Sequence, residues 1–84
     1  MVRGQALAME GLMQRLLARA ADDAGLRTAL GEAQATWLRN RDAECRVDTW
    51  ESASGTAAGT EWLYCLQRRN AARIAELRRR VETP

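Results

Sequence analysis

The stretch AQATWLRNRDAEC, residues 33–45, decides which fold this chain is expected to adopt. Within it, Trp37, Arg41 and Cys45 recur every four residues, the spacing that places side chains on adjacent rows of one helix face. The same face continues through Leu26, Leu30, Ala33 and Asp48. The sequence therefore predicts a helix over about residues 26–50.

An amphipathic stripe lies upstream of this helix. Its apolar residues are spaced three and four apart and comprise Met9, Leu12, Met13, Leu16, Leu17 and Ala20. This spacing predicts a first helix over about residues 6–21. Asp22, Asp23 and Gly25 then interrupt the pattern, and Asp23 is placed to cap the following helix by accepting backbone N–H bonds.

A third helix is predicted downstream, over about residues 60–81. It is indicated by a seam spaced three and four apart, which consists of Leu63, Leu66, Asn70, Ile74, Leu77 and Val81. Thr60 is placed to cap its start. No strand pattern competes, so residues 1–84 are expected to form one all-α domain of three helices.

The segment ESASGTAAGT, residues 51–60, is expected to be the one long loop, because small residues and two glycines offer no apolar face to bury. An antiparallel hairpin around this loop brings together residues whose numbers sum to about 110. Cys45 and Cys65 meet this condition, so a disulfide is expected to staple the hairpin and to contribute about 3 kcal/mol. Two buried free thiols are the alternative. A structural disulfide would indicate an oxidising compartment.

The same register predicts the neighbours of the quoted stretch. Trp37 is expected beside Arg73, with a guanidinium over its ring. Asp42 is expected to pair with Arg69, and Arg41 with Glu44. These side chains are interpreted as structural, since together they hold two helices in register.

Composition excludes several classes of function. The chain has no histidine and only two cysteines, so neither a zinc site nor the usual general base is expected, and no metal, cofactor or enzymatic activity is predicted. Its thirteen arginines are balanced by eleven acidic residues, which argues against nucleic-acid binding. No apolar run is long enough to span a membrane. Glu10, Gln14 and Arg15 interrupt any apolar core of a signal peptide, so none is predicted within this chain.

The motif WLxxRDAEC, formed here by Trp37, Leu38, Arg41, Asp42, Ala43, Glu44 and Cys45, resembles the LprI-type lysozyme inhibitor family. The resemblance covers about residues 30–81 and continues through Tyr64-Cys65-Leu66 and Arg73-Ile74-Ala75-Glu76-Leu77. It implies a small helical bacterial domain that is secreted, periplasmic or lipid-anchored, with oxidised cysteines. For at least some members it also implies inhibition of lysozyme.

The leading hypothesis is therefore a non-enzymatic protein-binding domain of the bacterial envelope that inhibits lysozyme. The loop is expected to insert into the enzyme's groove, with nearby arginines meeting acidic residues there, unless it is a mere connector. The candidate contact residues are Ser52, Ser54, Gly55, Thr56, Gly59 and Thr60.

An envelope assembly module without lysozyme activity is the alternative hypothesis. In that case the Met9 to Leu17 stripe would dock a partner helix or a second copy of the chain, although such a stripe is more often core. The sequence leaves the partner and the oligomeric state open.

Overall fold

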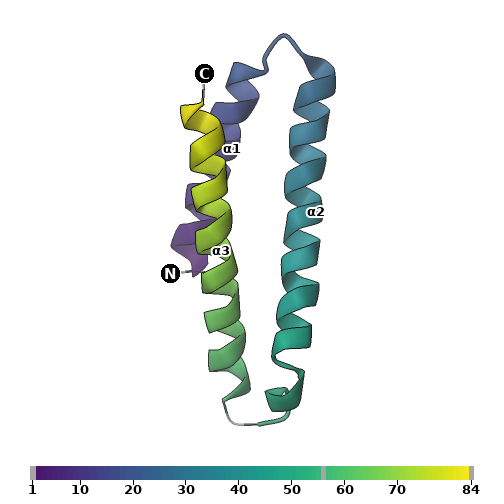
Figure 1. The fold of residues 1–84 in the computed structure, drawn as a ribbon, viewed down its shortest axis with the longest axis vertical. Coiled ribbons are helices and arrows are strands. Elements are labelled where there is room, and N and C mark those ends of the chain that lie inside the picture. The colour runs from purple at the N-terminus through teal and green to yellow at the C-terminus, as the bar shows by residue number, and fades with distance from the viewer. Residues whose placement is uncertain (1, 56, 84) are drawn as a thin grey trace.

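The computed structural model describes residues 2–55 and 57–83, and this part of the chain is helical without strands. It contains α1 (Val2–Arg19), α2 (Ala24–Asp48), the short 3-10 helix η1 (Trp50–Ser52) and α3 (Ala58–Glu82). The predicted all-α fold with three α-helices is confirmed for these residues. Figure 1 shows α2 and α3 side by side and running in opposite directions, with α1 behind α3.

Each α-helix begins earlier than predicted, α1 at Val2 and not near residue 6, and α2 and α3 two residues early. Asp23 caps α2 as predicted, because its Oδ1 accepts a hydrogen bond of 2.9 Å from the Leu26 amide. The predicted cap at Thr60 is wrong, since α3 begins at Ala58 and no side chain caps it. Alanine is the strongest helix former, so the helix extends through Ala58 and places Thr60 inside its first turn. The loop is correspondingly shorter than predicted, and η1 occupies part of it.

The main hydrophobic core lies between α1 and α3. The stripe of α1 supplies Met9, Leu12, Met13 and Leu16, which pack against Ile74 and Leu77 of α3. Because these side chains are buried, most of the stripe belongs to the core. A second, smaller cluster holds Cys45, Cys65 and Leu66, with Val2 and Trp62 packed against it.

Helix α1 covers only part of α3. The Gln5 side chain donates a hydrogen bond of 3.0 Å to the Gln67 carbonyl, and Arg19 donates one of 3.0 Å to the Arg80 carbonyl. Rising numbers in α1 therefore pair with rising numbers in α3, so the two helices run in the same direction. Because α3 starts at Ala58, its first two turns extend past the N-terminal end of α1, and in Figure 1 this end of the molecule is formed by α2, η1 and α3 alone.

Candidate functional site

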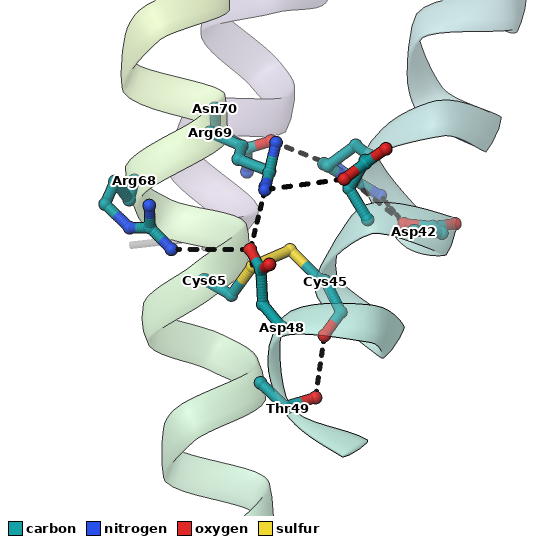
Figure 2. The surroundings of a disulfide bond; sticks show 10 residues. Asp42, Cys45, Asp48, Thr49, Cys65, Arg68, Arg69 and Asn70 are labelled. Atoms are coloured by element: carbon teal, nitrogen blue, oxygen red, sulfur yellow. Dashed lines mark hydrogen bonds and ion pairs between the residues drawn. A yellow bond between two sulfur atoms is a disulfide. The ribbon is translucent and has the colours of Figure 1, made fainter. Parts of the chain in front are cut away.

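We call the end of the molecule that is formed by α2, η1 and the first two turns of α3 the uncovered end. The disulfide between Cys45 and Cys65 lies at its border with α1. The two Cα atoms lie 5.7 Å apart, and both side chains are fully buried or nearly so. Figure 2 shows the bond crossing between α2 and α3. The predicted staple is thus confirmed, and the reading of two free thiols is wrong.

Ion pairs surround this bond, but not all with the predicted partners. Asp48 lies 2.6 Å from Arg69 and 3.8 Å from Arg68, so it links α2 to two arginines of α3 (Figure 2). Asp42 does not pair with Arg69. It accepts hydrogen bonds of 3.0 and 2.8 Å from its neighbour Arg41 and stays more than half exposed, because its position on α2 points away from α3.

Glu44 is also paired differently from the prediction. Its carboxylate lies 4.0 Å from Arg69, across the seam, and its expected bond with Arg41 is absent among the described contacts. Arg41 instead donates a 3.0 Å hydrogen bond to Oδ1 of the fully buried Asn70. This hydrogen bond links α2 to α3.

Two guanidinium groups lie near the ring of Trp37. The Cζ atoms of Arg41 and Arg73 are each 5.6 Å from its ring centroid, so the contact with Arg73 expected from the register is present. Arg73 is buried, donates to Gln34 at 3.0 Å and pairs with Glu76 at 2.7 Å. Burial lowers the pKa of the Arg73 guanidinium, an effect that Glu76 partly offsets. The contacts of Arg73 with Trp37 and Gln34 link α3 to α2.

Tyr64 takes no part in these contacts between α2 and α3. Its side chain is 65% exposed and lies on the outside of α3, where Arg68 is 5.9 Å from its ring centroid. The position follows from the helix period, since Cys65 next to it faces α2.

Ser52 and Gly55 of the loop make hydrogen bonds within the folded chain. The Ser52 hydroxyl lies in η1 and donates to the Glu61 carboxylate of α3. The Gly55 amide donates to the Ser52 carbonyl at 2.9 Å. Ser54, Gly55, Gly59 and Thr60 are exposed, and Thr56 lies outside the described residues. The chain therefore presents small side chains at this tip on a folded-back backbone.

An open pocket beside the loop was not predicted from the sequence. Its walls combine two tryptophans with small and polar residues, namely Arg46, Thr49, Trp50, Ala53, Ala58, Gly59 and Trp62. A usable signal was present, because two of the chain's three tryptophans flank the small-residue loop on either side. We call this site the tip pocket.

Two further searches of the described residues are negative. No group of three or more side chains able to ligate a metal comes together in residues 2–55 and 57–83. Within the same ranges, none of the helices has the length and apolar character required to cross a membrane.

Comparison with known proteins identifies the family. The family model described as Lysozyme inhibitor LprI matches residues 5–77, which reaches further upstream than the motif resemblance and takes in most of α1. Neither the curated proteins nor the solved structures contain a significant match. Because the family match spans most of the sequence, including the whole of α2 and the disulfide, this chain belongs to the LprI lysozyme inhibitor family.

Proposed function

We propose that this chain is a non-enzymatic domain of the bacterial envelope that binds and inhibits lysozyme. The observation that carries the proposal is the family match over residues 5–77. The disulfide supports a location outside the cytoplasm, where such bonds persist. The burial of Met9, Leu12, Met13 and Leu16 gives the assembly-module alternative less support, because most of its proposed docking stripe packs inside the core.

The uncovered end is the contact surface that we propose for lysozyme. The disulfide holds α2 and α3 as a stapled hairpin directly behind the loop, so the loop would meet the enzyme with little ordering cost. Its exposed small side chains suit entry into a substrate groove. Of the arginines near the loop, Arg68 and Arg69 already pair with Asp48. Arg46, by contrast, forms no ion pair with residues 2–55 and 57–83 and is the one we propose for contact with acidic groups of the groove.

The test is a muramidase assay on bacterial cell walls with the purified oxidised domain added. We expect inhibition by the oxidised domain, and less inhibition after the disulfide is reduced and the reductant removed. A folded, oxidised domain that leaves several types of lysozyme fully active would contradict the proposal.

A loop variant tests whether the tip, rather than another part of the surface, contacts lysozyme. Ser54→Tyr adds a bulky side chain to an exposed turn residue at the tip and is expected to abolish inhibition without unfolding the domain. Ala21→Tyr is the matched control, because Ala21 is an exposed turn residue between α1 and α2. Equal inhibition by both variants would remove the loop from the mechanism.

A further inference from the structure

We propose that the tip pocket is a saccharide-binding site whose ligand carries a carboxylate. This inference goes beyond the inhibition of lysozyme, because it assigns the chain a glycan ligand of its own. It depends on the walls of the pocket, on their rigidity and on the charge at its edge.

The walls of the tip pocket offer two aromatic faces. Trp50 is 68% exposed, an unusual state for a residue that buries most of its large surface in folded proteins. Trp62 lines the same pocket from α3. The C–H face of a sugar ring packs well on an aromatic ring while its hydroxyl groups remain in water. An open pocket lined by two tryptophans therefore suits a sugar ring.

The pocket is held in shape before any ligand arrives. Trp62 packs against the disulfide cluster, which fixes one wall. The other wall, η1, is tied to α3 by the bond from Ser52 to Glu61. Thr49 is fixed in turn, because its hydroxyl donates to the Cys45 carbonyl at 2.7 Å. A preorganised site of this kind loses little entropy on binding.

The space between the walls comes from residues without long side chains. Ala53, Ala58 and Gly59 line the pocket, and a Cβ atom added at Gly59 would meet nothing within 4 Å. The site therefore has room for a ring. It can also be filled by mutation without forcing the backbone to move.

The charge at the edge of the pocket selects an acidic ligand. Arg46 lines it, is exposed and forms no ion pair with any of residues 2–55 and 57–83. By contrast, Arg41, Arg68 and Arg69 all have carboxylate partners. No acidic side chain is among the described residues that line the pocket. A guanidinium group binds a carboxylate with two parallel hydrogen bonds, so Arg46 can hold an acidic sugar.

The experiment is a titration of the purified oxidised domain, without lysozyme, followed by tryptophan fluorescence. The probes are a disaccharide that contains N-acetylmuramic acid, which bears a carboxylate, and neutral di-N-acetylchitobiose of equal length. We expect the acidic disaccharide to bind roughly two- to fivefold more tightly, the range for one exposed ion pair. Equal affinity for the two probes, or no binding at millimolar concentration, would overturn the inference.

Variants assign any binding to the pocket. Arg46→Gln is expected to remove the preference for the acidic probe, whereas Arg39→Gln, a change at another exposed arginine of α2, should keep it. Trp50→Ala should lower the affinity for both probes about tenfold, because one aromatic ring of the pocket is lost. Tyr64→Ala, at a similarly exposed aromatic residue outside the pocket, should not.

A variant that fills the pocket gives a second test, which is needed because Trp50→Ala can also alter the loop. Gly59→Leu should block binding, and Gly4→Leu, at another glycine with open space around it, should leave binding intact. Binding that survives Gly59→Leu overturns the inference. Because lysozyme is absent from the titration, this result is independent of whether the domain inhibits that enzyme.

Discussion

Arg73 is central to the polar contacts between α2 and α3. It is 5% exposed and joins three groups, namely Trp37, Gln34 and Glu76. Burial of the cation lowers its pKa, but an arginine remains charged throughout the neutral range. Its stabilising contribution therefore comes from the partners that it satisfies.

Replacing Arg73 with methionine tests this role. Arg73→Met keeps an apolar stem but leaves Gln34 without its donor, and we expect a loss of about 1–3 kcal/mol in the free energy of unfolding. Urea denaturation of the oxidised protein measures the loss. Arg78→Met, at an exposed arginine of the same helix, is the control and should change the value by less than about 0.5 kcal/mol. Equal effects would show that the contacts of Arg73 add nothing.

The sequence predicts a contact between α2 and α3 only where the contact depends on how far along the two helices the residues lie. The disulfide and the Trp37–Arg73 contact follow from the register, because facing positions at one height must meet. The partner of Asp42 does not follow, since it depends on where around the helix its side chain points. Asp42 points away from α3, and Arg69 pairs with Asp48 one turn beyond Glu44.

At the scale of the elements, Asp23 defines the start of α2. Its side chain accepts from the Leu26 amide, so Asp23→Ala should cost about 1 kcal/mol in the free energy of unfolding. Thermal unfolding followed by circular dichroism measures this cost. Asp22→Ala is the matched control, since Asp22 is exposed in the same turn and its carboxylate is not the cap. A stability loss shared equally by the two variants would contradict the capping role.

Arg19 connects the ends of two elements. It donates to the carbonyls of Arg80, Val81 and Thr83 at 2.6–3.0 Å, which satisfies the last turn of α3. Arg19→Met should accelerate amide hydrogen exchange in the last turn of α3 while exchange at Leu77 stays slow. Arg15→Met, one turn earlier on α1, should leave the exchange rates of α3 unchanged. Unaltered exchange in Arg19→Met would rule out this C-terminal cap.

The elements were predictable to within a few residues at most ends. Apolar spacing identified three helices, because each buries one face against its neighbours. The predicted start of α3 is two residues late, because helix propensity extends the helix through Ala58, before the expected cap at Thr60. The largest difference is at α1, which begins at Val2 and not near residue 6. The tip pocket was missed for another reason. Trp50 lies outside the α-helices, in η1, so helical spacing says nothing about which way it faces.

For the whole molecule, the disulfide and the apolar core stabilise different ends. The core lies between α1 and α3, whereas the Cys45–Cys65 bond closes a loop of 20 residues beyond most of α1. Reduction should therefore lower the free energy of unfolding by about 3 kcal/mol. Urea denaturation with and without a thiol reductant measures the difference. An unchanged midpoint would mean that the bond does not constrain the unfolded chain.

The effect of reduction should also be uneven along the molecule. Amide exchange in the first two turns of α3 is expected to accelerate, because only α2 and η1 adjoin them. Exchange at Ile74 and Leu77, in the α1–α3 core, should change far less. Uniform acceleration across α3 would show that the two ends unfold as one unit.

The incomplete coverage of α3 by α1 has a consequence for how such a domain can evolve. Near the start of α1 the disulfide joins α2 and α3, and most residues beyond it lie outside the α1–α3 core. If the tip is the contact surface proposed above, the core serves as a support for an exchangeable loop. Loops between Asp48 and Ala58 could then be exchanged while the α1–α3 core and the disulfide cluster keep their packing, so one scaffold could present different recognition surfaces.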